Sequence, residues 1–280
     1  MLLLYAKANA NAIGRTIIVA KEWIQKSGQE NNQFRTKLDV LCNHKHEDII
    51  SLAGYCDEQG ETIIVYKHVW NGSLDEHLNN LNLTWIKRIH ICINVASGLE
   101  FLHGGGVTQK KLVHGNIKSA NILLTADGKA KISNFEFSSL DSLHQHMDHV
   151  SDNAYGTFSY LDPEYAISGF LTDKSDLYSF GPLAKRRFKE GNFSEMVFEG
   201  IKQEIVPESY SSFVNIAYEC LRDVGYKRPE AREVVLQLKK ALEFQEDKEI
   251  WEPMLPRNYR EIIRIVTKPT GSTISTEKGF

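Results

Sequence analysis

The sequence predicts a two-lobed α+β fold, in which a small β-rich half is followed by a larger α-rich half. Two observations lead to this prediction. The hydrophobic pattern changes from strand-like runs to helical spacing near residues 66–71, which we take as the junction between the halves. The chain has 280 residues, of which 42% are hydrophobic and 25% charged, and this is enough for two packed lobes of ordinary globular composition.

The first half is expected to contain strands around one helix. Residues 33–42 place Phe34, Leu38 and Leu41 at helical spacing, so a helix is predicted there. Runs rich in β-branched and apolar residues predict strands at 16–21, 49–55 and 62–69.

The second half is expected to be mainly helical. A long helix is predicted at 85–103, because Ile89, Ile93, Ala96 and Leu99 fall on one stripe. The other expected segments are a short helix at 73–81, short strands within 112–133, an irregular stretch at 134–172, and helices from 172 to 242, of which the last covers 230–242. The charged, Ser/Thr-rich end of the chain predicts a partly disordered tail. The expected units are thus an N-terminal lobe at 1–69, a C-terminal lobe at 70–245 and a tail at 246–280.

Composition and charge argue against several functions. The net charge of -3 gives no basis for nucleic-acid binding. No apolar run approaches the roughly 18 residues that a membrane span requires. The four cysteines have neither disulfide nor metal spacing, so reduced thiols and a cytoplasmic location are expected. The sequence leaves the oligomeric state open.

Several segments follow one another in an order that carries more information than any one of them. They are Ile50–Glu58, Asn71–Leu78, Leu83–Ile93, Val113–Leu124, Lys131–Glu136, Gly156–Tyr165, Asp173–Gly181 and Arg228–Pro229. In this order and spacing they resemble the protein-kinase domain, in its plant receptor-like or receptor-like cytoplasmic form. The resemblance covers residues 4–243 and implies a protein-kinase-like fold of the Ser/Thr type, with ATP and Mg²⁺ as the family's ligands. Residues 249–265 faintly resemble the linker after the kinase domain in plant proteins that carry a phloem-lectin-like module.

The resemblance also assigns site roles, position by position. The assigned positions are Asn116 and Lys118 as catalytic, Lys21, Val19, Tyr66 and Leu123 around ATP, and Asn121 and Asn134 at Mg²⁺.

The catalytic and metal positions depart from the family's pattern. Residues 114–116 read His-Gly-Asn where the family has His-Arg-Asp, and the neutral amide of Asn116 cannot accept a proton from a substrate hydroxyl. Gly115 removes the arginine that would pair with a phosphorylated activation loop. Residues 134–136 read Asn-Phe-Glu where the family has Asp-Phe-Gly, and the Asn134 amide is a weaker Mg²⁺ ligand than a carboxylate.

The phosphate-clamping positions depart as well. Lys21 matches the family's strand lysine, but Lys37 falls where the partner glutamate on the helix should be. Two neighbouring ammonium groups repel, so Lys37 is expected to point away, or the helix to swing outward. Glu136 is expected to point elsewhere rather than to supply the lost metal charge. The N-terminal lobe is expected to be truncated and to lack the glycine-rich loop, since residues 1–15 contain Gly14 alone.

The packing positions follow the family more closely. They are His114, Phe135, Leu41 and Leu52 for a hydrophobic spine between the lobes, Asp176 for the backbone of the catalytic loop, and Glu164 with Arg228 for a buried ion pair. The spacing between Gly181 and Ala217 is short for the family, so the region after Gly181 is expected to be shortened.

These departures predict a catalytically dead pseudokinase that acts by binding a protein partner, such as an active kinase or a receptor. No cofactor is expected. Two alternatives stay open at this point: a weak or atypical Ser/Thr kinase that uses ATP, and a degraded gene product without function.

Overall fold

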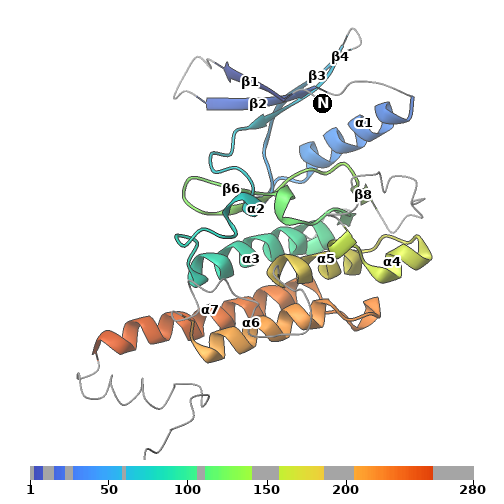
Figure 1. The fold of residues 1–280 in the computed structure, drawn as a ribbon. Helices are drawn as coiled ribbons and strands as arrows, with labels where there is room; N and C mark the ends of the chain where they lie inside the picture. Colours follow the sequence, from blue (N-terminus) through green and yellow to red (C-terminus); the bar gives the residue numbers. More distant parts are fainter. Residues whose placement is uncertain are drawn as a thin grey trace, which may run out of the picture.

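The computed structural model describes residues 3–8, 16–22, 28–58, 61–105, 111–140, 158–185 and 205–254. Within them a small β-sheet lobe with one helix is followed by a larger helical lobe (Figure 1). The predicted two-lobed α+β architecture is therefore confirmed. The segment around Gly14, the middle of the stretch predicted to be irregular, and the tail beyond Met254 lie outside the described residues.

The N-terminal lobe is built on an antiparallel sheet in the order β1-β2-β4-β3. Its strands are β1 (Leu3–Ala8), β2 (Thr16–Glu22), β3 (Leu52–Glu58) and β4 (Glu61–Lys67). Val19 of β2 lies directly opposite Tyr66 of β4, so two residues of the predicted ATP site are neighbours in this sheet. The strand predicted at 49–55 begins only at Leu52, because Ile49 pairs with Ile132 of the other lobe.

Helix α1 (Gly28–Asn43) is the helix of this lobe and lies beside the sheet (Figure 1). Its buried positions include Phe34, Lys37 and Leu41, which recur every three or four residues and so share one face. Asp39 is exposed on another face, where its carboxylate accepts a hydrogen bond from the Asn43 amide at 2.7 Å. The buried face of α1 therefore carries a lysine in an otherwise apolar row.

The C-terminal lobe contains the remaining helices and several very short strands. The helices are α2 (Leu74–His77), α3 (Trp85–Glu100), α4 (Pro163–Ser168), α5 (Asp173–Lys185), α6 (Pro207–Cys220) and α7 (Ala231–Met254). The strands are β5 (Leu112–Val113), β6 (Ile122–Leu124), β7 (Ala130–Ile132) and β8 (Ser139–Leu140). Strand β5 pairs with β8, and β6 pairs with β7, so both pairs flank the loop that follows β5.

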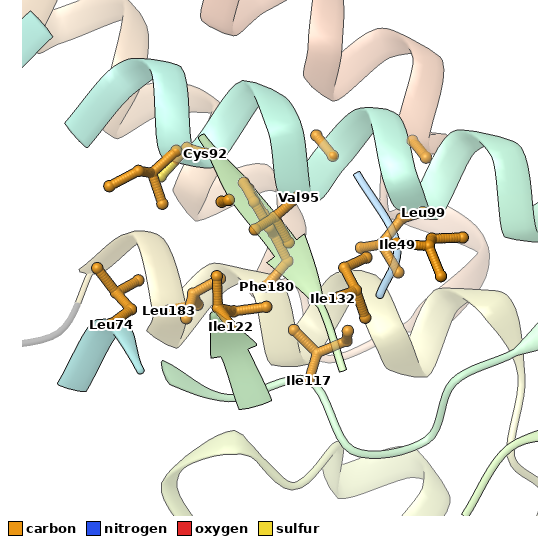
Figure 2. Close-up of a cluster of buried hydrophobic side chains, with 14 of the residues drawn as sticks. Ile49, Leu74, Cys92, Val95, Leu99, Ile117, Ile122, Ile132, Phe180 and Leu183 are labelled. Atoms are coloured by element: carbon orange, nitrogen blue, oxygen red, sulfur yellow. The ribbon is translucent and has the colours of Figure 1, made fainter. Parts of the chain in front are cut away.

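The core of this lobe forms where α3 meets α5 and the β6–β7 pair. Figure 2 shows Cys92, Val95 and Leu99 of α3 on the side that faces Ile122 and Ile132. All five side chains are buried, which fixes the short strands against the long helix. On α5 a glycine allows close packing with α6: a Cβ atom on Gly181 would lie 2.6 Å from the Leu221 side chain.

Backbone hydrogen bonds join the two lobes at separate places. On one side the connection after β4 pairs with β6, since the Asn71 N–H donates to the Leu124 carbonyl and the Leu124 N–H to the Gly72 carbonyl. On the other side the Ile132 N–H donates to the Asp48 carbonyl, and the Ile50 N–H donates to the Ile132 carbonyl. The segment between α1 and β3 is thus attached to the C-terminal lobe.

The predicted end of the last helix was wrong. Helix α7 runs from Ala231 to Met254 and so continues well beyond residue 242, where the helix was predicted to end. Gln245 is buried, and its side-chain oxygen accepts a hydrogen bond from the Val206 N–H at 3.0 Å. A polar residue thus extends the packed face of α7, which a search for apolar periodicity does not detect. The stretch predicted to be irregular also contains the short helix α4.

Candidate functional site

A cavity of about 760 Å³ lies between the lobes. It is bounded by β2 and β4 of the sheet, by α1, by the connection after β4 and by the C-terminal lobe around β6 and β7. Five of the predicted site residues line it, namely Val19, Tyr66, Leu123, Asn121 and Asn134. These residues therefore surround one space, and their assignment to ATP and Mg²⁺ stays a prediction.

The sheet and β6 supply the apolar walls of this cavity. Val19 and Leu123 are half-buried and Tyr66 is buried, so they present a mainly hydrophobic surface to it. Burial raises the pKa of the Tyr66 hydroxyl, and the nearby Glu136 carboxylate adds to the effect, so this phenol stays protonated. At the mouth, Trp70 is 62% exposed and its ring lies 5.1 Å from that of His68.

The loop after β5 is held by one carboxylate of α5. Asp176 is buried and accepts hydrogen bonds from the backbone N–H groups of His114 at 2.7 Å and Gly115 at 2.8 Å. The His103 ring lies 3.0 Å from the same carboxylate. The predicted role of Asp176 in fixing this loop is confirmed.

The buried His114 ring links this loop to the next segment. Its Nδ1 accepts from the Asn116 N–H at 3.2 Å and its Nε2 lies 3.0 Å from the Ser133 carbonyl, so Nε2 carries the hydrogen. Its ring meets that of Phe135 edge-on at 4.8 Å. Burial lowers the pKa of His114, although Asp176 acts in the opposite direction. His114 is therefore neutral, and the predicted spine contact with Phe135 is present.

The two predicted metal positions contain neutral amides that contact each other. The Asn134 Nδ2 group donates to Asn121 Oδ1 at 3.3 Å, and Asn121 Nδ2 donates to the Asn116 carbonyl at 2.7 Å. Asn134 has a φ of 64°, a left-handed conformation that asparagine tolerates better than most residues. Mg²⁺ favours charged oxygen ligands, and neither position supplies a carboxylate. This donor set does not fit Mg²⁺.

Lys37 lies at the inner end of the cavity and is only 1% exposed. Its Nζ atom is 3.7 Å from Oε1 of Glu136. The predicted alternatives for Lys37, a side chain directed away from Lys21 or an outward helix, stay predictions, because the Lys21 side chain is outside the described part of the chain. The prediction that Glu136 does not supply the lost metal charge is likewise not tested by its contact with Lys37. Lys37 is stable in the interior because the Glu136 carboxylate balances an ammonium group that burial alone would disfavour.

The remaining predicted site residues are placed less completely. Asn116 does not line the large cavity and instead borders a small one of about 40 Å³ beside Asp176. Lys118 is half-buried just before the 3₁₀ turn Ser119–Asn121, and its carbonyl accepts from the Asn121 N–H at 2.9 Å. Lys21 lies in β2 opposite Ile64, and its side chain is outside the described part of the chain.

The predicted buried ion pair forms with a different partner. Arg228 donates to both carboxylate oxygens of Asp162, at 2.7 and 2.9 Å, whereas Glu164 is exposed and accepts from the Gly225 N–H at 2.6 Å. The pairing of Arg228 with Glu164 was therefore wrong. Asp162 is the N-cap residue of α4, and its carboxylate accepts from the Glu164 N–H as well as from the Arg228 guanidinium.

Comparison with known proteins agrees with this geometry. Residues 5–238 match the family described as protein tyrosine and serine/threonine kinase. The chain is 36% identical over 260 residues to the receptor-like protein kinase HERK 1 of Arabidopsis thaliana, covering 82% of this chain and 31% of that protein. It is 35% identical over 264 residues to the receptor-like protein kinase FERONIA of the same plant, covering 84% of this chain and 29% of that protein.

The two-lobed fold, the cavity between the lobes and the loop fixed by a buried aspartate, together with the family match, identify a protein-kinase domain. The chain belongs to the protein tyrosine and serine/threonine kinase family, and its similar proteins include plant receptor-like kinases. It spans about 30% of the length of the curated relatives described above. In the described ranges, no helix has both the length and the apolar character that crossing a bilayer demands.

Two residues of this site were missed as functional partners. Glu136 was noted only as a departure from the family's glycine, because spacing along the chain does not reveal that its carboxylate meets Lys37. Asp162 was overlooked beside Glu164. A search for an acid to balance each buried cation would have drawn attention to both residues.

Proposed function

We propose that this kinase domain is a pseudokinase, which has lost phosphotransfer and acts by binding a protein partner. One observation carries the proposal: positions that need carboxylates in the family hold Asn116, Asn134 and Lys37. Two of these line the cavity between the lobes, and the third lies in the loop that Asp176 fixes. Each replacement acts on a different requirement of the reaction.

The first requirement is a base for the substrate hydroxyl. A carboxylate accepts this proton, and general-base assistance is worth about 10²–10⁴ in rate. The Asn116 side chain can donate and accept hydrogen bonds, but an amide does not take up a proton near neutral pH. A substrate hydroxyl bound there would keep its proton.

The second requirement is a metal bound by charged oxygens. Asn134 and Asn121 offer one amide oxygen each, and that of Asn121 already accepts from the Asn134 amide. The third requirement is a phosphate-binding lysine that is held in place by a glutamate on the helix. Lys21 occupies the lysine position, but the glutamate position is occupied by Lys37, which pairs with Glu136 at 3.7 Å, so the helix offers Lys21 no acid there.

What stays in place is the packing of the C-terminal lobe, and we propose that this ordered lobe contributes to the surface that binds another protein. The Asp176 contacts, the His114–Phe135 contact and the Arg228–Asp162 pair all lie within this lobe and do not depend on phosphotransfer. We propose an active kinase or a receptor as the partner, and the cytoplasm as the location. This follows from the family alone, because the resemblance to receptor-like kinases links the chain to kinase signalling.

The test combines phosphotransfer and ligand binding on the purified chain. Radiolabelled ATP with Mg²⁺ or Mn²⁺ should give no incorporation into the chain itself or into a generic substrate. Millimolar Mg-ATP should leave the melting temperature unchanged, whereas a ligand at 100 times its dissociation constant would stabilise by about 2.7 kcal/mol.

An active receptor-like kinase domain serves as the positive control in both assays. Incorporation by the wild-type chain that disappears in a Lys118→Met variant would show a working kinase and overturn the proposal. A clear rise in melting temperature with Mg-ATP would remove its argument from the metal and phosphate positions.

A further inference from the structure

Lys37 occupies an unusual position for a lysine. It lies on the buried face of α1 between Phe34 and Leu41, which are three residues before it and four after it. Within the described residues, it is the lysine that is almost completely buried, with 1% of its surface exposed. Removing an ammonium group from water is costly unless an opposite charge lies close by. The position therefore depends on a compensating acid.

Glu136 supplies that acid from the other lobe. Its Oε1 atom is 3.7 Å from Lys37 Nζ, and its side chain is 26% exposed. The carboxylate also raises the pKa of Tyr66, after burial, so it lies near β4 as well as near α1. The ion pair connects a helix of the N-terminal lobe with a residue almost a hundred positions later in the chain.

The segment that carries Glu136 is itself well anchored. The preceding Phe135 is buried against His114, and its carbonyl accepts from the Ser138 hydroxyl at 2.8 Å. The left-handed conformation of Asn134, at a φ of 64°, turns the backbone just before this point. Glu136 therefore presents its carboxylate from a turn that is held by other contacts. Because this turn is already fixed, the Lys37–Glu136 ion pair acts on the position of α1.

The order of charges is reversed relative to the family pattern. The family has an acid on this helix and a glycine at the position of Glu136, whereas this chain has a base on the helix and an acid in the turn. Each change alone would be unfavourable, because one buries a cation and the other places an anion beside a buried tyrosine. Together they neutralise each other.

We propose that Lys37 and Glu136 form a charge-reversed latch that holds α1 against the turn after Phe135 without nucleotide or metal. The latch keeps the N-terminal helix in one position relative to the C-terminal lobe. A partner protein then meets a constant surface around α1. The latch does not depend on the loss of phosphotransfer, since it rests on the ion pair alone.

Amide hydrogen exchange on the full chain tests the latch. The variants are Lys37→Met, Glu136→Gln, the double variant, and the swap Lys37→Glu with Glu136→Lys. Exchange in α1 is read relative to exchange in α3, so that a change in global stability cancels. Glu136→Gln alters a partly exposed side chain, and it keeps the test valid if Lys37→Met does not fold.

Each single variant should raise relative exchange in α1 about tenfold, which corresponds to about 1.4 kcal/mol. The double variant should be no faster than the faster single variant, and the swap should recover most of the protection. Glu219→Gln, which breaks the exposed pair with Arg222, is the control and should leave α1 unchanged. The latch would be overturned if α1 exchanged at the wild-type rate in both single variants. It would also be overturned if the increases in α1 exchange caused by the two single substitutions added up in the double variant.

Discussion

Arg228 and Asp162 form a bidentate ion pair, in which the Arg228 side chain is 0% exposed and the Asp162 side chain is 3% exposed. The guanidinium also donates to the carbonyl oxygens of Arg222 and Lys174, so its hydrogen-bonding groups are directed into the surrounding backbone. Asp162 in turn accepts from the Glu164 N–H at the start of α4. This one carboxylate therefore joins α4 to the loop before α7.

The first prediction compares the two neighbouring acids of this region. Asp162→Ala should lower the free energy of unfolding by about 3–5 kcal/mol, because it leaves a buried guanidinium without its counter-charge. Glu164→Ala should cost only about 1 kcal/mol, since it removes one acceptor for the Gly225 N–H from an exposed side chain. Urea unfolding measures both. Equal midpoints for the two variants would contradict the assignment of Asp162 as the partner.

The second prediction concerns the backbone of the catalytic loop. Gly115 has a φ of 73°, and a Cβ atom there would lie 2.8 Å from the Leu171 side chain and 2.9 Å from the Phe137 carbonyl. Gly115→Ala should therefore destabilise by about 1–3 kcal/mol, and Gly115→Arg should not be better tolerated.

Gly128 provides the matched control for this variant. Its φ is 83°, but no atom lies within 4 Å of a Cβ built there. Gly128→Ala thus measures the cost of the left-handed backbone alone. Thermal unfolding of Gly115→Ala and Gly128→Ala separates the cost of the left-handed backbone from the cost of the steric collision. An equal loss of stability in both variants would show that the surroundings of Gly115 accommodate the added Cβ atom at no cost.

The third prediction is a pH dependence that originates at His114. Burial lowers the pKa of His114 in the folded state below its ordinary value of 6.5. As the pH falls below 6.5, the unfolded chain binds a proton at this residue while the folded chain resists it. The contribution of neutral His114 to stability is therefore complete above this pH and is lost progressively below it.

Replacing His114 should remove this part of the acid sensitivity. In His114→Gln, the free energy of unfolding should be lower at pH 7 but should fall less steeply between pH 6.5 and 5 than in wild type. His90 is exposed on α3, so His90→Gln is the control and should keep the wild-type slope. If the free energy of unfolding falls equally steeply with decreasing pH in wild type and in both variants, the acid sensitivity does not originate at His114.

The fourth prediction concerns repair of the catalytic loop. Asn116→Asp alone should not produce phosphotransfer, because a base does not help when phosphate and metal are not positioned. Adding Asn134→Asp, Lys37→Glu and Glu136→Gly should be required before any activity is detected. Radiolabel incorporation is the measurement, with the single variant compared directly with the fourfold variant. Robust activity of the single variant would mean that Asn116 is the only defect.

The sequence was sufficient to predict the fold because side-chain periodicity and the order of motifs can both be read directly along the chain. The two halves, the strand at 16–21 and the long helix at 85–103 all follow from side-chain spacing, and the structure contains elements at these places. The end of α7 could not be predicted in this way. Its packed face continues through the polar Gln245, whose hydrogen bond to Val206 depends on where α6 begins.

The site was predictable as a set of positions but not as a set of contacts. Alignment with the family brought Val19, Tyr66 and Leu123 to one cavity, because the fold alone determines their places. The contact of Lys37 with Glu136 depends on a turn around Asn134 and on the rotamer of a buried lysine. Spacing along the chain reports neither of these quantities.

The paired backbone attachments between the lobes have a mechanical consequence. A rigid body held at two points keeps one rotational freedom, about the line through those points. Here the points are the Asp48–Ile132 hydrogen bond behind the cavity and the Asn71–Leu124 hydrogen bond beside it. Rocking of the sheet about this line would break neither bond, but the Lys37–Glu136 ion pair is a third attachment, which joins α1 to the C-terminal lobe. If α1 moves together with the sheet, a tilt that opens the cavity about this axis must also separate that ion pair.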